Sequence, residues 1–435
     1  MVSVDTSVPW LTPNQQMWAV EGLLKYGLLK IDNNRSLPLK SGGKTDIYIT
    51  IRDARNNPEA IKFLTDLYAI PLKLLESDRF AEIPDSVSCI AGPLSIKCNI
   101  PYITIRETAK EGRATDSKII GQCNPREKIP IIDDVVTDGA SKVIPISECK
   151  KRNAQSDIII VLVDRQQGWK EKIGSDVAVW PGMTLHDVRR CLIEIGALQR
   201  CDPATEAKNP IIIALDGKGW EEILPIIDLL RTTGCILKVN DLLFEEGFGL
   251  ISNLSVYGRV MVDIKGDDIP DTIKRITTRL RKYNPWGVTV HASGGGEMIS
   301  AAVEVLKGTP TKVIGVTLLT SIDDTSCKNI YTRNPADQVL VLAAIAIENG
   351  AHGLVCSPNE VGILSRAYPK TTLIVPGIRS AEISIANDDQ KRIGTPSQTI
   401  KDGANHIVMG RQIFQAPDPV YEVHRILKEE LGLAL

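Results

Sequence analysis

The sequence contains no C-x-x-C pair, although it has nine cysteines among its 435 residues. Because zinc sites and disulfide frameworks show regular cysteine spacing, we expect these cysteines to be buried apolar side chains in a reducing compartment. The N-terminal stretch MVSVDTSVPW has no basic segment followed by an apolar one, so no signal peptide is expected. No apolar run is long enough to cross a bilayer. These features together predict a cytoplasmic protein.

A strong charge of either sign is also absent, because 51 basic residues face 53 acidic ones and the net charge is −2. This balance argues against broad electrostatic binding to nucleic acid or membrane, but it allows small anionic ligands. The content of 43% hydrophobic and 24% charged residues is that of an ordinary globular protein. A chain of this length exceeds one hydrophobic core, which predicts two domains.

The polar, proline-containing segment 201–210 has no apolar periodicity and marks the expected boundary. We predict a first domain over 1–203, a linker over 204–209 and a second domain over 210–435. In the second domain, short β-rich runs alternate with helix-like patterns, which predicts a closed parallel (β/α)₈ barrel. The expected strands are IIIALD (211–216), ILKVN (236–240), VMVDIK (260–265), GVTVHA (287–292), KVIGVTLLT (312–320), GLVCS (353–357), TLIVPGI (372–378) and HIVMGR (406–411).

The stretch DIKGDDIPDT, residues 263–272, places four carboxylates around Lys265 at the end of a predicted barrel strand. Side chains two apart share a face of a strand, so Asp263 and Lys265 are expected to project together. Neighbouring carboxylates hold a lysine charged and aimed, which suits it to donate a proton to a developing carbanion. An exposed acidic loop is the alternative. Asp216, Lys238 and His291 lie at other strand ends, where His291 could equally be a core or rim residue.

The last two predicted strands end in PGIR (376–379) and MGR (409–411). Loops after the seventh and eighth strands of such barrels commonly bind phosphate. Glycine amides and arginine guanidinium groups suit a phosphate dianion. Ordinary turns with surface arginines are the alternative.

The segment from about 210 to 430 resembles the orotidine 5'-phosphate decarboxylase family in IIIALD, LKVN, DIKGDDIPDT, VHASGGGEM, VTLLTS, GLVCS, VPGIR, DDQKRIGTP and VMGR. The resemblance implies cofactor-free decarboxylation of orotidine 5'-phosphate to uridine 5'-monophosphate in pyrimidine biosynthesis. It implies that Lys265 protonates C6 of the pyrimidine, that Asp263 lies near the leaving carboxylate and that Lys238 completes the charge network. It also implies a homodimer, with Asp268 and Thr272 reaching the neighbouring subunit's site. The implied substrate-binding residues are Asp216, Thr272, Ser321, Pro376, Gln390, Gly410 and Arg411.

The first domain has fewer regular patterns, but KIPIIDDVVTDGAS (128–141) reads as a buried strand followed by a Thr/Gly/Ser loop. A second strand is expected after Asp46. A strand ending in such a loop predicts an open α/β sheet with a ligand beyond its carboxyl end. A plain strand and turn is the alternative.

Residues 10–200 resemble orotate phosphoribosyltransferases in LKSGGKTDIYITIR and PIIDDVVTDGAS. The resemblance implies orotate and phosphoribosyl pyrophosphate (PRPP) as ligands. Asp133 and Asp134 would hold the ribose hydroxyls, directly or through Mg²⁺, and the loop 137–141 would cradle the 5-phosphate. The implied PRPP-binding residues are Lys40, Arg106, Lys110, Asp133, Asp134, Thr137, Gly139 and Ser141. The pairing of the two domains is similar to bifunctional uridine 5'-monophosphate synthases.

Two departures from the transferase pattern predict a weakened or lost transferase, kept as a scaffold. The loop that reads R-K-E-x-K-x-H-G in the family reads RETAKEGR here, so Glu107 replaces a lysine and no histidine precedes Gly112. By comparison with the transferases it resembles, the segment 90–101 also lacks about ten residues of a loop that helps bind pyrophosphate and orotate in that family.

Two other functions remain open for the barrel. Keto-sugar-phosphate decarboxylases share the D-x-K-x-x-D pattern but use Mg²⁺, so insensitivity to EDTA separates the two reactions. A nucleotide-binding regulatory protein would be expected to lack a residue of the charge network, yet Lys238, Asp263, Lys265 and Asp268 are all present.

Overall fold

The computed structural model describes residues 5–33, 35–38, 44–108, 118–382 and 393–433. The chain forms two compact units, Met1–Gln199 and Arg200–Leu435. Within the described residues, no helix combines the length and the apolar character needed to span a membrane.

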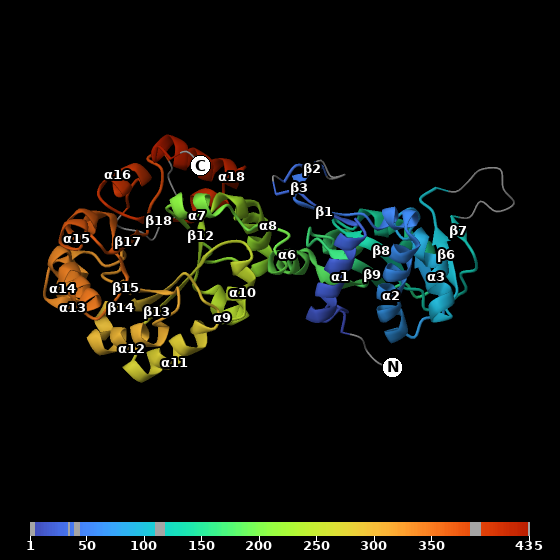
Figure 1. Ribbon diagram of the computed structural model, residues 1–435, viewed down its shortest axis with the longest axis horizontal. Coiled ribbons are helices and arrows are strands. Elements are labelled where there is room, and N and C mark those ends of the chain that lie inside the picture. The colour runs from blue at the N-terminus through green and yellow to red at the C-terminus, as the bar shows by residue number, and fades with distance from the viewer. Residues whose placement is uncertain (1–4, 34, 39–43, 109–117, 383–392, 434–435) are drawn as a thin grey trace. The chain divides into compact units, whose positions relative to one another are not determined.

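The first unit is built on an open six-stranded sheet with the order β10-β9-β8-β5-β6-β7 (Figure 1). All neighbouring strands are parallel except β6 and β7. The strands are β5 (Phe80–Glu82), β6 (Tyr102–Ile105), β7 (Ile119–Ile120), β8 (Ile131–Val136), β9 (Ile158–Asp164) and β10 (Ala178–Thr184). Two antiparallel pairs accompany the sheet: β1 (Leu29–Ile31) with β4 (Ile47–Ile49), and β2 (Leu37–Pro38) with β3 (Lys44–Thr45). The predicted open α/β sheet is confirmed.

Both faces of this sheet are covered by helices. Ile132 and Ile160 pack into one hydrophobic cluster, whereas the adjacent Ile131 and Ile159 pack into another. Successive side chains of a strand point to opposite faces, so this division places one core on each side. The helical segments are α1 (Pro13–Lys25), η1 (Ile51–Asn56), α2 (Pro58–Leu74), α3 (Ser88–Cys98), η2 (Ala140–Lys142), α4 (Val143–Lys150), α5 (Lys170–Ile173) and α6 (Leu185–Glu194).

The second unit is a closed barrel in which β11 to β18 follow in chain order, and β18 pairs with β11. The strands are β11 (Ile211–Ala214), β12 (Ile236–Val239), β13 (Val260–Gly266), β14 (Gly287–His291), β15 (Lys312–Val316), β16 (Gly353–Val355), β17 (Thr372–Val375) and β18 (His406–Met409). Seven of the eight lie within the predicted runs and β13 extends one residue beyond its run, so the (β/α)₈ barrel is confirmed. A cluster of inward side chains fills its centre: Ile212, Ile236, Met261, Ile314, Ile374 and Val408.

Helices of the second unit surround the strands (Figure 1). They are α7 (Pro203–Lys208), α8 (Trp220–Leu230), η3 (Arg231–Thr233), α9 (Leu242–Glu246), α10 (Leu250–Ser255), α11 (Pro270–Arg281), η4 (Ala292–Gly294), α12 (Gly296–Leu306), α13 (Asp324–Tyr331), α14 (Pro335–Glu348), η5 (Pro358–Glu360), α15 (Val361–Ala367), α16 (Pro396–Lys401), α17 (Arg411–Phe414), α18 (Pro419–Arg425) and a π-helical turn η6 (Ile426–Glu430).

The segment predicted as a linker, 204–209, is part of the second unit and mostly forms helix α7. The Asp202 side chain caps this helix by accepting from Thr205 N, and Pro203 occupies its first turn. Asn209 then fixes the entry to the barrel, since its side chain donates to Thr233 O across 2.7 Å and accepts from Ile211 N. Local capping, which apolar periodicity does not detect, therefore orders this polar segment.

Candidate active site

Four charged side chains of alternating sign form a continuous chain at the carboxyl ends of β11, β12 and β13. Lys238 Nζ lies 2.6 Å from Asp216 Oδ2 and 3.1 Å from Asp263 Oδ2. Lys265 Nζ lies 2.8 Å from the same Asp263 oxygen. The order is therefore Asp216, Lys238, Asp263, Lys265, with each ammonium facing at least one carboxylate.

The two central members of this chain are buried and charged. Lys238 is 6% exposed and Asp263 is 5% exposed. Burial opposes the charge of Lys238, but attraction to Asp263 and Asp216 outweighs it and raises the lysine pKa above its usual value. Burial likewise opposes ionisation of Asp263, but Lys238 and Lys265 together lower the pKa of that carboxyl. The two central groups are therefore both held in their charged forms at neutral pH.

The backbone at Lys265 is unusual. Its φ is +46°, a region that side chains other than glycine rarely adopt, and the pairing of β13 with β14 shifts register between Val262 and Gly266. The fully buried Thr289 holds this irregular turn, since its Oγ1 accepts from Lys265 N and donates to Asp263 Oδ1, both across 2.9 Å. One hydroxyl thus fixes the backbone of the lysine and the carboxylate beside it.

The charge network opens into a cavity of about 490 Å³. Lys265 and Arg411 line this same cavity, together with Gly377, Arg379 and Gly410 from the ends of β17 and β18. The wall also contains apolar side chains: Met261, Val316, Leu318, Val355, Ile374 and Val408. A pocket that combines charged groups of both signs, arginines, glycine amides and an apolar wall suits an anionic ligand with an uncharged part.

A model of the orotidine 5'-phosphate decarboxylase / HUMPS family matches residues 209–426, half of the chain. The chain belongs to this family. An orotidine 5'-phosphate decarboxylase of Pseudomonas putida (strain W619) is 39% identical over 228 residues, which are 51% of this chain and 97% of that protein. Among solved structures, the orotidine 5'-phosphate decarboxylase from Lactobacillus acidophilus is 33% identical over 51% of this chain and 99% of its own, with a TM-score of 0.46. Leishmania donovani UMP synthase is 26% identical over 43% of this chain and 40% of its own, with a TM-score of 0.37.

Most of the residues predicted for the barrel site line this one cavity. The cavity is lined by Asp216, Lys238, Asp263, Lys265, Pro376, Gly410 and Arg411. Ser321 is exposed and is not part of the lining, whereas the adjacent Thr320 is. Gln390 lies outside the described residues. His291 is half-buried at the end of β14 and does not line the cavity; burial lowers its pKa, partly offset by Asp267.

The loop that was expected to reach a neighbouring subunit lies away from the cavity of its own chain. Asp268 is exposed and accepts from Ile269 N across 2.7 Å. Thr272 is half-buried in the first turn of α11. Neither residue lines the described cavity.

Several residues of the site were not predicted from the sequence. Thr289, which lies behind the charge network, was signalled only by a hydroxyl within the apolar run GVTVH. Lys218, Phe414 and Gln415 line the cavity, and Lys218 Nζ lies 5.8 Å from the centre of the Phe414 ring. These three carried no signal, because only chain folding brings the segments after β11 and β18 together.

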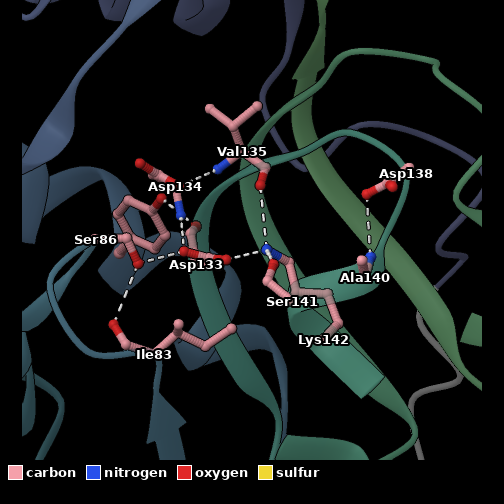
Figure 2. Close-up of polar contacts among 10 residues, drawn as sticks. Ile83, Ser86, Asp133, Asp134, Val135, Asp138, Ala140, Ser141 and Lys142 are labelled. Atoms are coloured by element: carbon pink, nitrogen blue, oxygen red, sulfur yellow. Dashed lines mark hydrogen bonds and ion pairs between the residues drawn. The ribbon is translucent and has the colours of Figure 1, made fainter. Parts of the chain in front are cut away.

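In the first unit, Asp133 and Asp134 lie in the middle of β8, and Figure 2 shows their polar contacts. Asp133 accepts from Ser86 Oγ and from Asp134 N, and it forms an ion pair with Lys142. The Tyr68 hydroxyl donates to Asp133 O across 2.6 Å. Burial and the adjacent Asp133 carboxylate raise the pKa of Asp134 to about 7.

Of the other residues expected to bind PRPP, three lie on the loop after β8, one follows β6, and two are not described. Thr137 and Ser141 are exposed on the loop after β8, and Gly139 is buried there with φ +78°. A side chain at Gly139 would meet Ile173, which requires glycine at this position. Arg106 is half-buried just after β6, beside the exposed Glu107. Lys40 and Lys110 lie outside the described residues.

Proposed function

We propose that the barrel decarboxylates orotidine 5'-phosphate to uridine 5'-monophosphate without a metal or organic cofactor. One observation carries this proposal: the chain Asp216–Lys238–Asp263–Lys265 and Arg411 line a single cavity. Family membership supports it.

In the proposed reaction the substrate carboxylate lies beside Asp263 and Lys265. The bond between C6 and the carboxylate carbon breaks, carbon dioxide leaves, and the electron pair stays on C6. Lys265 then gives its proton to C6 and takes a new one from water, which its partly exposed side chain can reach. Fixed positive charge near C6 stabilises the developing carbanion, and repulsion between Asp263 and the substrate carboxylate is relieved as carbon dioxide departs.

The remaining cavity residues are assigned to substrate binding. Arg411 and Gly410 hold the 5'-phosphate, with Gln390 as a further partner, and Asp216 holds ribose hydroxyls while Pro376 packs on the ligand. Ser321 is assigned to the pyrimidine amide, and Thr320 is the adjacent residue that lines the cavity. Binding energy from the phosphate, far from C6, can be used to hold the carboxylate against Asp263.

The test incubates the full-length protein with orotidine 5'-phosphate in EDTA and follows carbon dioxide release. We expect turnover, its loss in Lys265→Ala, and its retention in the control Lys307→Ala, which removes an exposed lysine just after α12. Turnover that survives Lys265→Ala would remove the proposed acid. Activity that appears only with Mg²⁺ and a keto-sugar phosphate would favour the alternative reaction.

We further propose a homodimer in which Asp268 and Thr272 complete the partner's site. The exposed Asp268 and the neighbouring Ile269, which is 65% exposed, support this assignment. Mixing inactive Lys265→Ala with inactive Asp268→Ala protein tests it. Shared sites predict recovered activity, because hybrid dimers then contain one intact site; sites confined to one chain predict none.

For the first unit we propose a phosphoribosyltransferase-like domain whose transfer of PRPP to orotate is weakened or lost. Its strand β8 with the acidic pair supports the likeness, and the exposed Glu107 supports the loss. In a Lys265→Ala background, where orotidine 5'-phosphate would accumulate, we expect little consumption of orotate with PRPP and Mg²⁺. Consumption at a rate normal for such transferases would overturn the proposed loss.

A further inference from the structure

The Lys142 side chain is buried beneath the acidic pair of the first unit (Figure 2). Only 3% of this side chain is exposed. Its ammonium pairs with Asp133 Oδ2 and donates to Ser141 Oγ across 2.9 Å and to Val135 O across 3.3 Å. A lysine ammonium has three N–H donors, so all of them are used within the protein. Lys142 therefore has no donor left for a ligand.

Both carboxylate oxygens of Asp133 also have partners within the protein. One of its carboxylate oxygens accepts from Ser86 Oγ and from Asp134 N, and the other pairs with Lys142. The side chain is 4% exposed. A divalent cation at Asp133 would have to displace a buried ammonium, or bind beside it against charge repulsion. The donor set does not fit Mg²⁺.

The loop that was expected to bind the 5-phosphate is also partly occupied by one of its own side chains. Asp138 accepts from Ala140 N across 3.2 Å and pairs with Lys172. A loop amide that could bind a phosphate thus already faces a carboxylate, as Figure 2 shows. The loop carries an internal anion where an anionic ligand was expected and an internal cation where a metal was expected.

We infer that Lys142 is a built-in counter-ion that replaces the divalent cation at Asp133, so that this loop is locked by its own charges and takes no Mg²⁺–PRPP. Asp133 is then a structural carboxylate rather than a ligand-binding one. This inference deepens the proposed loss of transferase activity and depends on no property of the barrel. If Asp133 binds a metal while orotate is still not consumed, this inference fails and the proposed loss stands.

The experiment titrates full-length protein with Mn²⁺ and follows the free ion by electron paramagnetic resonance. We expect no Mn²⁺ binding that depends on Asp133 in the unaltered protein up to about 1 mM, a range that covers ordinary oxygen-ligand sites. The variant Lys142→Ser removes the ammonium and should gain a Mn²⁺ site. Its dissociation constant should lie at least about tenfold below that 1 mM limit. The matched variant Lys142→Ser/Asp133→Asn should lose that site again.

A measurement that leaves Lys142 in place covers the case in which its replacement unfolds the unit. The unaltered protein is heated with and without Mg²⁺ and PRPP, and compared with Asp133→Asn. We expect no change in unfolding temperature from the ligands, and a lower unfolding temperature in Asp133→Asn, because Lys142 then loses its partner. A stabilisation by Mg²⁺–PRPP, or a Mn²⁺ site, that Asp133→Asn abolishes would overturn the inference.

Discussion

The ammonium of Lys238 lies 3.1 Å from the carboxylate of Asp263, and both side chains are at least nine-tenths buried. Removing one partner of a buried ion pair leaves the other charge uncompensated, which typically costs about 3–5 kcal/mol. We therefore expect Lys238→Met to lower the free energy of unfolding of the barrel by that order, and to reduce decarboxylation at least about 100-fold. Urea unfolding and steady-state kinetics measure the two effects. The exposed control Lys307→Met should change neither, and equal effects in both variants would contradict the special role of Lys238.

Thr289 links the Lys265 backbone to Asp263 through one hydroxyl. The variant Thr289→Val keeps the shape of the side chain but leaves a buried N–H and a carboxylate oxygen without this partner, at a cost of about 1–3 kcal/mol. We expect kcat to fall about 10- to 100-fold while KM changes less. The reason is that the variant disturbs the orientation of Lys265 but leaves the groups that bind the ligand in place. Thr289→Ser retains the hydroxyl and should restore most of kcat. A rise in KM with an unchanged kcat would argue against a positioning role.

Arg411 follows β18 and lines the same cavity as the charge network. If it binds the phosphate, Arg411→Ala removes a charge-assisted contact worth about 1.5–3 kcal/mol, which corresponds to a loss of about 10- to 150-fold in kcat/KM. We expect the loss mainly in KM, in contrast to Lys265→Ala. The exposed Arg366 on α15 provides the matched control, Arg366→Ala. Equal kinetics of Arg411→Ala and the unaltered protein would place the phosphate elsewhere.

His406, the first residue of β18, packs edge-on against Trp286 with ring centres 5.1 Å apart. Burial, followed by the charges of Arg259 and Lys312, lowers its pKa from 6.5 to about 4. Below pH 6.5 this histidine is therefore protonated in the unfolded chain, whereas in the folded barrel it is protonated only near pH 4. The contribution of His406 is therefore full above pH 6.5 and is lost as the pH falls towards 4, by about 3 kcal/mol in all.

The variant His406→Phe should flatten this part of the pH dependence. Urea unfolding between pH 7 and 4, read by hydrogen exchange in peptides that cover β17 and β18, measures it. The exposed His424 gives the control His424→Phe, which should retain the slope of the unaltered protein. A slope that persists in His406→Phe would assign the titration to another group.

The barrel could be predicted from the sequence because each strand carries its own signal. The runs 211–216 and 406–411 are apolar, short and bounded by polar clusters, and parallel strands of this kind close only in a limited set of folds. The charge network was predictable in outline because Asp263 and Lys265 share a strand face. The helix α7 was missed, since capping by Asp202 gives a polar segment its order without any apolar period.

The sequence by itself determined the order of the elements, the two units, and which residue types stand at each strand end, because periodicity and residue spacing act locally along the chain. Only the tertiary structure decided which of those residues meet. It brought the ends of β13 and β18 onto one cavity, placed Thr289 beneath Lys265, and turned Lys142 back onto Asp133. Such contacts depend on the closure of the barrel or on the direction in which a buried side chain points. The spacing of residues along the chain predicts neither, because it records only local periodicity.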